Sequence, residues 1–224
     1  MAADCKQKVR TDVYSRDTAE FCLKAQALVA KVAPHSAAHV NLLGQLGLAC
    51  SYNNLLGADR ARGYYEEMLE VSEATYGQGS VEIIEPLVNL AALDSVAGAW
   101  ESERRRLLVA LTASKTHAGP KSERTGRILS SIAQNYRAEH AKSPATYKLD
   151  DAIVYQKELA EHTEAVQGLK DYHTGLDWLE LGKMMQIKGD KLEARRLTAK
   201  ALQIFVDTKS EFLIEGARKQ LKSL

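Results

Sequence analysis

The chain has 224 residues, enough for one or two ordinary domains or for a single elongated array of repeats. Its 30 basic and 29 acidic residues leave a formal net charge of +1, so no overall field would draw it to nucleic acid or to a membrane surface. Hydrophobic residues make up 45% and charged residues 26%, which excludes a disordered chain. With only 4 prolines and 14 glycines, and no period-2 apolar alternation, the sequence predicts an all-α protein.

Cysteine content and hydropathy bear on the compartment. The three cysteines, Cys5, Cys22 and Cys50, are few and odd in number, which argues against a disulfide framework and favours an intracellular, cytoplasmic location. No apolar run approaches the roughly 20 residues that a membrane-spanning helix needs. The N-terminal segment mixes Asp4 with Lys6 and has no apolar stretch, so we expect no secretory signal.

The expected elements follow one another as pairs of helices. Residues 1–34 form a degenerate first unit, in which Asp17 and Glu20 give a capping-box signal. The expected buried positions of this unit are Ala19, Leu23, Gln26 and Ala27. Residues 35–206 divide into four units, 35–75, 76–117, 118–167 and 168–206, with turn residues between them. Residues 207–224 form a last, polar helix that caps the end of the array.

A small residue recurs after an apolar one in the first helix of each of the four units. The positions are Cys50, Ala91, Ala133 and Gly182, at intervals of 41, 42 and 49 residues. A period of this size is the signature of a helical solenoid, in which each unit buries its apolar face only against its neighbours.

The unit 168–206 shows the packing pattern most clearly. Trp178, Leu181, Gly182 and Met185 share one face of the first helix, and Gly189 ends that helix. Asp190 and Glu193 then supply a capping box for the second helix. The stripe expected to face back from that helix is Ala194, Thr198, Ala201 and Ile204. The small residues would let the two antiparallel helices approach closely.

The other units repeat this pattern in their second helices. The expected stripes are Arg62, Glu66 and Leu69 (with Ala61 as an alternative), Glu103, Leu107 and Ala110, and Ala152, Gln156 and Leu159. The extra seven residues of the longest interval fall between Ala133 and Ala152. Because Ser143-Pro144 lies there, we expect an enlarged turn over residues 140–148.

The spacing Trp178-x2-Leu181-Gly182-x2-Met185 resembles the tetratricopeptide repeat (TPR). The interval of about 42 residues is similar to the longer repeat of kinesin light chains, and so is the run Leu87-Val88-Asn89-Leu90-Ala91. The resemblance implies a right-handed helical solenoid of about four helix-turn-helix units. It also implies a non-catalytic adaptor that binds proteins, with no cofactor.

In such arrays the first helices line a groove that binds a peptide segment or a subunit of a larger complex. Residues one or two positions off the packing stripe are expected to face this groove, with Gly47 among them. The candidate partner-binding residues are Leu48, Ser51, Val88, Asn89, Ala92, Arg127, Ser131, Gln134, Leu179 and Lys183. The alternative is that they are solvated helix faces. Asn89, Arg127 and Lys183 could hold a carboxylate or a peptide backbone.

Two other kinds of binding site have weaker support in the sequence. The run Arg104-Arg105-Arg106 could contact RNA, but pairing with Glu101 and Glu103 on the same helix explains it without a partner. Nucleic acid is therefore the alternative and not the expected partner. His35 and His39 have a metal-ligand spacing but no third ligand beside them, so no metal site is expected.

Catalytic patterns are not found in the sequence. Adjacent carboxylates such as Glu66-Glu67 diverge on a helix, and no phosphate-binding glycine loop occurs. Cys50 takes a packing position, which indicates an inert buried thiol. An enzyme with its chemistry near Pro144 would need a cleft that the sequence does not indicate, so we expect no enzyme and no catalytic residue.

Overall fold

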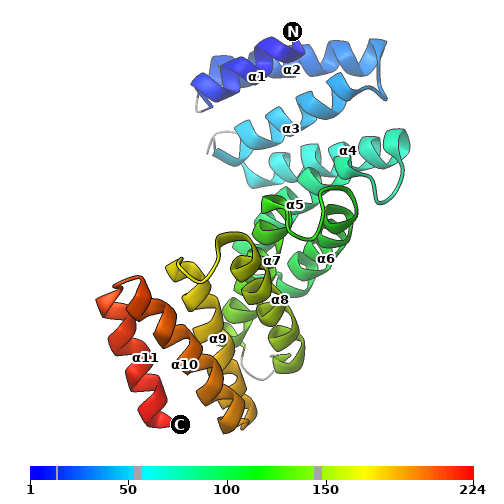
Figure 1. Cartoon of the computed structure of the whole chain (residues 1–224). Coiled ribbons are helices and arrows are strands. Elements are labelled where there is room, and N and C mark those ends of the chain that lie inside the picture. Colours follow the sequence, from blue (N-terminus) through cyan, green and yellow to red (C-terminus); the bar gives the residue numbers. More distant parts are fainter. Residues whose placement is uncertain (14, 53–56, 144–147) are drawn as a thin grey trace. The chain divides into compact units, whose positions relative to one another are not determined.

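The computed structural model describes residues 1–13, 15–52, 57–143 and 148–224. Across these ranges the chain forms eleven α-helices, a single 3-10 turn and no strand, so the prediction of an all-α protein is confirmed (Figure 1). The helices are α1 (Ala2–Thr11), α2 (Arg16–Val32), α3 (Ala37–Tyr52), α4 (Ala58–Tyr76), α5 (Ile84–Val96), α6 (Trp100–His117), α7 (Glu123–Lys142), α8 (Leu149–Gln167), α9 (Tyr172–Lys188), α10 (Lys191–Asp207) and α11 (Glu211–Ser223). They group into two compact units, Met1–His117 and Ala118–Leu224.

In the first unit each helix packs on the next one along the chain, and α1 also lies on α3. A carboxylate ties three of these helices together. Asp94 of α5, almost fully buried, accepts from Arg62 of α4 at 2.8 Å and from Arg106 of α6 at 2.9 Å. Burial alone would raise the pKa of Asp94, but hydrogen bonds from Ser102 and the two arginines hold it below its usual value.

In the second unit α9 and α10 form the most extensive helix pair, with α8 and α11 on either side of it. Trp178 of α9 donates its indole N–H to Glu164 Oε2 of α8 at 2.7 Å. Lys200 of α10 places its Nζ 3.8 Å from the centre of the Trp178 ring and pairs with the same glutamate. These contacts hold one face of α9 between its two neighbours.

The close pairing of α9 and α10 depends on Gly182. A Cβ added at this glycine would lie 2.8 Å from Thr198 Oγ1 and 3.3 Å from the Ala194 carbonyl oxygen, so only glycine fits without displacement. The expected stripe of α10 is buried throughout, and Asp190 caps that helix by accepting from the Glu193 backbone N–H. The packing predicted for this unit is therefore confirmed.

Replacing Gly182 with leucine is expected to lower the free energy of unfolding by about 1–3 kcal/mol, because the side chain would force α9 and α10 apart. Gly216 of α11 has open space around it and makes the matched control, since Gly216→Leu adds the same side chain without a clash. Thermal and urea unfolding of the two variants measure the difference. Equal stability of both variants would show that the α9–α10 contact tolerates a side chain.

Two of the predicted stripes are wrong by one residue. In α4 the alternative position Ala61 is confirmed in place of Arg62, and the stripe continues with Tyr65 and Met68, while Glu66 is exposed. The cause is Gly47 of α3, which leaves room for the Tyr65 ring: a Cβ at position 47 would overlap that ring.

The first unit of the sequence prediction needs the same correction in α2. After Ala19 the buried residues are Cys22 and Ala25, and Ala27 is exposed. The N-cap residue is Ser15, so Asp17 lies inside the first turn of the helix and does not cap it.

The predicted enlarged turn over 140–148 is wrong in part. Residues 140–142 are helical, because α7 continues nine residues past Ala133, whereas α5 continues five past Ala91. About half of the extra length therefore lies in an additional turn of α7. Residues 144–147, with Pro144, lie outside the described residues.

The cysteine count argued against a disulfide framework, yet one disulfide forms. Cys5 of α1 and Cys22 of α2 are bonded to each other, and both are fully buried among Val9, Ala25 and Leu42. Only Cys50 is a free thiol, and it is buried, as expected for a packing residue. The odd number of cysteines was misleading, because two of them form a bond and the third is a packing residue. The cytoplasmic location inferred from that number therefore loses its basis.

Replacing Cys5 and Cys22 together with serine is expected to lower the free energy of unfolding by about 3 kcal/mol, because the bond closes a loop of 17 residues in the unfolded chain. Urea unfolding with and without dithiothreitol measures this loss. The reductant should destabilise the natural chain and leave the double variant unchanged; an identical response of both chains would contradict a stabilising bond.

Candidate functional site

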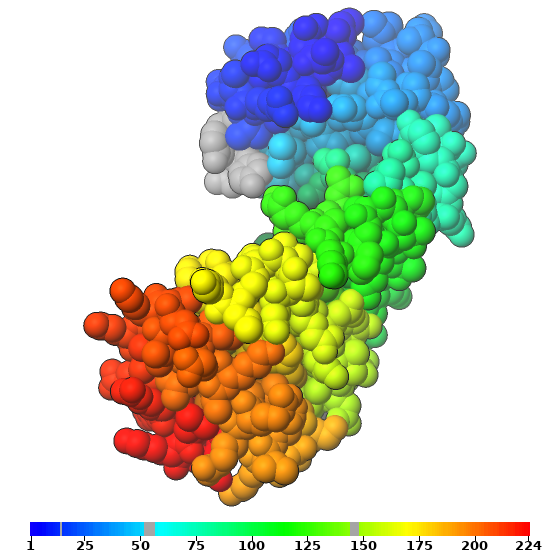
Figure 2. Space-filling model, viewed as in Figure 1, coloured from blue at the N-terminus to red at the C-terminus, as the bar shows by residue number. Residues whose placement is uncertain are grey.

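A hollow of about 370 Å³ opens in the second unit, flanked by α7 and α9 with α8 as its floor. Its size lies at the lower end of the range for ligand pockets and matches about a dozen water molecules. The residues that line it are Glu123, Gly126, Arg127, Ser130, Leu159, His162, Thr163, Val166, Gln167, His173, Leu176 and Asp177. The connector between α8 and α9, yellow in Figure 2, lies at the surface beside it.

The α7 edge is fixed by the way this helix begins. Ser122 is the N-cap and accepts from the Thr125 backbone N–H at 3.2 Å. Thr125 is fully buried and donates its hydroxyl to the Gly119 carbonyl at 2.8 Å. This anchors the first turn, from which Glu123 and Arg127 project as an exposed ion pair at the rim.

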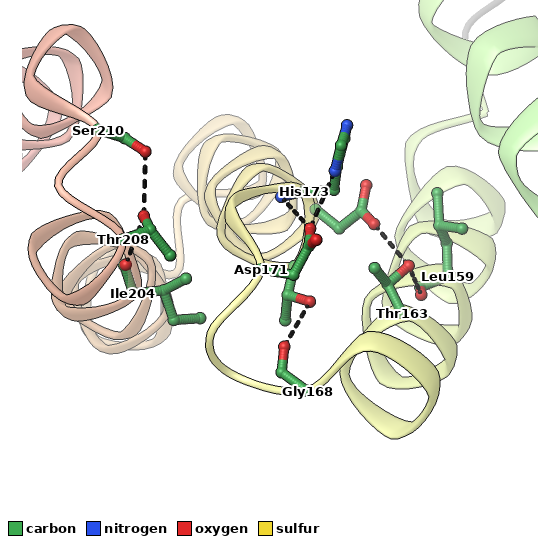
Figure 3. Close-up of polar contacts among 10 residues, drawn as sticks. Leu159, Thr163, Gly168, Asp171, His173, Ile204, Thr208 and Ser210 are labelled. Atoms are coloured by element: carbon green, nitrogen blue, oxygen red, sulfur yellow. Dashed lines mark hydrogen bonds and ion pairs between the residues drawn. The ribbon is translucent and has the colours of Figure 1, made fainter.

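The α9 edge begins in the same way. Asp171 caps α9 by accepting from the His173 backbone N–H at 2.8 Å, and Thr174 donates to the Gly168 carbonyl at 2.9 Å (Figure 3). The Asp171 carboxylate also lies 2.9 Å from His173 Nδ1, which orients the imidazole ring. The same glycine–threonine pair therefore occurs twice, as Gly119 with Thr125 and again 49 residues later as Gly168 with Thr174. This is also the interval of the small-residue repeat in this part of the chain.

The floor is provided by His162 of α8. Its Nε2 lies 3.1 Å from the Ser122 carbonyl oxygen, so this nitrogen carries the proton. The ring lies against Gly126, where an added Cβ would overlap it. Nδ1 is then left as a hydrogen-bond acceptor in the neutral ring, at the wall of the hollow.

Asp177 is an ionisable group of the hollow whose pKa clearly departs from its usual value. Its Oδ2 lies 2.8 Å from Thr163 Oγ1, which also lies 3.0 Å from the Leu159 carbonyl oxygen (Figure 3). Burial raises the pKa of Asp177 above its usual value, although Thr163, Arg137, Gln156 and His173 offset part of the effect. Thr163 has a single hydroxyl proton, which it can donate either to the Asp177 carboxylate or to the Leu159 carbonyl.

Replacing Asp177 with asparagine is expected to stabilise the fold at pH 7. Because its pKa is raised, the Asp177 carboxyl binds its proton more tightly in the folded chain than in the unfolded chain. The stability that this proton contributes to the fold is fully present below the pKa of the unfolded chain, about 3.9. It is lost as the pH rises through the pKa of the folded chain. The amide introduced by Asp177→Asn, by contrast, is uncharged at every pH and avoids this loss.

Urea unfolding at pH 7 and at pH 3 tests this, with Asp151→Asn as the control because Asp151 is exposed on α8. The difference between Asp177→Asn and the natural chain should be present at pH 7 and vanish at pH 3. A less stable variant at pH 7 would contradict a raised pKa.

A similar hollow of about 320 Å³ occurs in the first unit, flanked by α3 and α5 with α4 as its floor. Met68 forms part of this floor and lies against Gly44, where an added Cβ would be 3.3 Å from its sulfur. Glu82 and Glu85 lie on the α5 side, and Lys6 of α1 lies at the rim. Each unit therefore has a hollow between two consecutive first helices.

The structure brings only Arg127, among the ten candidate residues, into either hollow. Ser131 and Gln134 lie further along α7, and Lys183 is exposed but pairs with Glu180 at 3.0 Å. Leu179 is buried in the core of its unit and is not available to a partner. The other candidate residues lie on α3 and α5 and are exposed or half-buried: Leu48, Ser51, Val88, Asn89 and Ala92. Gly47, also expected to face the groove, is covered by Tyr65.

His162, His173 and Asp177 were not predicted as site residues. The predicted residues lie near the small-residue stripe, whereas the hollow lies closer to the starts of α7 and α9. The repeated glycine and threonine at the start of α7 and α9 carry the signal that could have placed it. Each pair anchors the first turn from which the rim projects.

The alternative sites do not assemble as clusters. Arg104 is buried and lies 3.6 Å from Glu101, Arg106 is held by Asp94, and Arg105 alone points outward, so the three arginines present no common basic patch. His39 is buried, with Nδ1 against the Pro34 carbonyl and Nε2 3.5 Å from Glu67. Burial raises the pKa of the Cys50 thiol, although Arg60 opposes this, as expected for an inert thiol.

Metal-ligand clusters and membrane-spanning helices have no candidate among the described residues. In the part of the chain that the structure describes, no three His, Cys, Asp or Glu side chains gather as metal ligands. None of the helices in the described ranges combines the length and the apolarity needed to cross a bilayer.

No protein-family model and no curated protein matches this sequence. Solved structures do match it. BtubC (BKLC) from P. vanneervenii is 15% identical with a TM-score of 0.58, over 92% of this chain and 85% of that chain. A putative kinesin light chain from Podosopora anserina, with nearly identical TPR-like repeats, is 13% identical with a TM-score of 0.69, over 92% and 94%. A second structure of that putative light chain gives 0.68 at 13% identity, over 93% and 94%.

At these identities the likeness shows the fold alone. The chain is an all-α, TPR-like helical-repeat solenoid, so the resemblance found in the sequence is confirmed.

Proposed function

We propose that the protein is a non-catalytic adaptor that binds a peptide segment or subunit of a larger complex on its first helices, which are α3 and α5 in the first unit and α7 and α9 in the second. The observation that carries this proposal is the hollow of the second unit, because it opens between two consecutive first helices and is lined by polar groups held in place by neighbours. Helical repeats commonly offer such faces to extended peptides.

Several of the candidate residues keep their place in the proposal. Arg127, Ser131 and Gln134 lie along α7 from the hollow onward and would meet a peptide that continues past it. Lys183 of α9 would extend this surface within the second unit, and Leu179 is dropped because it is buried. The candidate residues of the first unit would form a surface of their own there, made of Leu48, Ser51, Val88, Asn89 and Ala92. The division of residues 35–206 into four repeats, with 1–34 and 207–224 as end units, belongs to the same proposal.

Site-specific photo-crosslinking in the native source tests this function. A benzoylphenylalanine at Gln134 or Ser131 of α7 is expected to capture a partner protein, identified by mass spectrometry of the adduct. The matched control positions are Val154 and Glu161, which are exposed on the second helix α8. Adducts at the α8 positions alone, or at none of the four, would overturn the assignment of the binding face.

A further inference from the structure

The hollow of the second unit combines aliphatic surface with one unpaired carboxyl group, which together suit a long basic side chain. Leu159, Val166 and Leu176 contribute aliphatic surface to it. The carboxyl group of Asp177 stands at the α9 side and makes no ion pair with any described residue, because its hydrogen-bond partners are neutral. A partly buried carboxylate without a cation is costly, and a ligand that supplies the cation removes that cost.

The other charged groups at the hollow are already balanced or held. Glu123 and Arg127 pair with each other at the rim. Arg137 and His173 both act on Asp177 electrostatically and lower its pKa, but neither forms an ion pair with it. One negative charge, that of ionised Asp177, is therefore left for a ligand to meet.

The two histidines have fixed proton positions that point to the same kind of ligand. His162 donates from Nε2 to the Ser122 carbonyl, and His173 donates from Nδ1 to the Asp171 carboxylate. When a ring held in this way is uncharged, its other nitrogen can only accept a hydrogen bond, as the carboxylate oxygens of Asp177 do. These nitrogens are Nδ1 of His162 and Nε2 of His173. Ser130 and Gln167 can turn either as donors or as acceptors. A ligand rich in donors matches this set, and a carboxylate does not.

We propose that this hollow recognises a lysine or arginine side chain of a basic peptide segment. The aliphatic walls would cover the methylene stem, and the ammonium or guanidinium group would reach Asp177 and the histidine nitrogens. The inference rests on the proposed function, since it names the chemistry of the peptide that the first-helix face would bind.

Fluorescence anisotropy with three labelled dodecapeptides tests the proposal. In the first, arginine alternates with serine; in the others, glutamine or glutamate replaces every arginine. The arginine peptide is expected to bind the natural chain about tenfold more tightly than the glutamine peptide. Asp177→Asn should remove most of that difference, while Asp151→Asn, the same charge change at an exposed position of α8, should leave it in place.

A second variant guards against an indirect effect of Asp177→Asn on folding. Ser130→Lys keeps the carboxylate and adds a tethered ammonium group at the α7 wall, so it should compete with the arginine peptide and weaken its binding about tenfold. Melting curves of each variant establish that the fold is retained.

The outcomes separate this inference from the proposed function. Equal binding of the arginine and glutamine peptides, or undiminished arginine binding in both Asp177→Asn and Ser130→Lys, would overturn the recognition of a basic side chain. Preference for the glutamate peptide would also overturn it, while α7 crosslinks to a partner would leave the adaptor function standing. Failure of the crosslinks with retained, Asp177-dependent arginine binding would overturn only the adaptor function.

Discussion

The close approach of paired helices governs how both units are packed. At several crossings a glycine on the first helix removes the side chain that would otherwise hold the pair apart. The contacts are Thr198 against Gly182, Phe205 against Gly175, Tyr65 against Gly47 and His162 against Gly126. At three of these crossings a ring fills the space that the missing Cβ leaves. Glycine costs helix stability, about 1 kcal/mol relative to alanine, so the packing of the ring must offset that cost.

The same constraint shapes the hollow of the second unit. Because the His162 ring lies against Gly126, it forms a floor between α7 and α9 and does not fill the space above it. The N-caps Ser122 and Asp171 then fix the first turns on either side, and each of them also holds one histidine. The polar groups of the hollow are thus positioned by the starts of two helices and by a single glycine.

The helix pairs, the repeat interval and the buried stripe of α10 could be predicted from the sequence, since all three follow from the periodicity of small and apolar residues. The prediction failed by one residue in α4 and α2, where the decisive contact is a long-range one. Tyr65 is buried because Gly47, on another helix, makes room for it, and Cys22 turns inward to meet Cys5. The position of the hollow along α7 could not be predicted for a related reason. Its lining comes from three helices, and only Arg127 lies on the face that local spacing singled out.

The burial of the bond between Cys5 and Cys22 has a kinetic consequence. Both cysteines are fully buried, so a thiolate in solution cannot reach the bond while α1 stays packed on α2 and α3. Reduction must then wait for this end of the unit to open, and its rate at high reductant concentration equals the opening rate. A thiol-trapping time course would therefore measure how fast this end of the first unit opens.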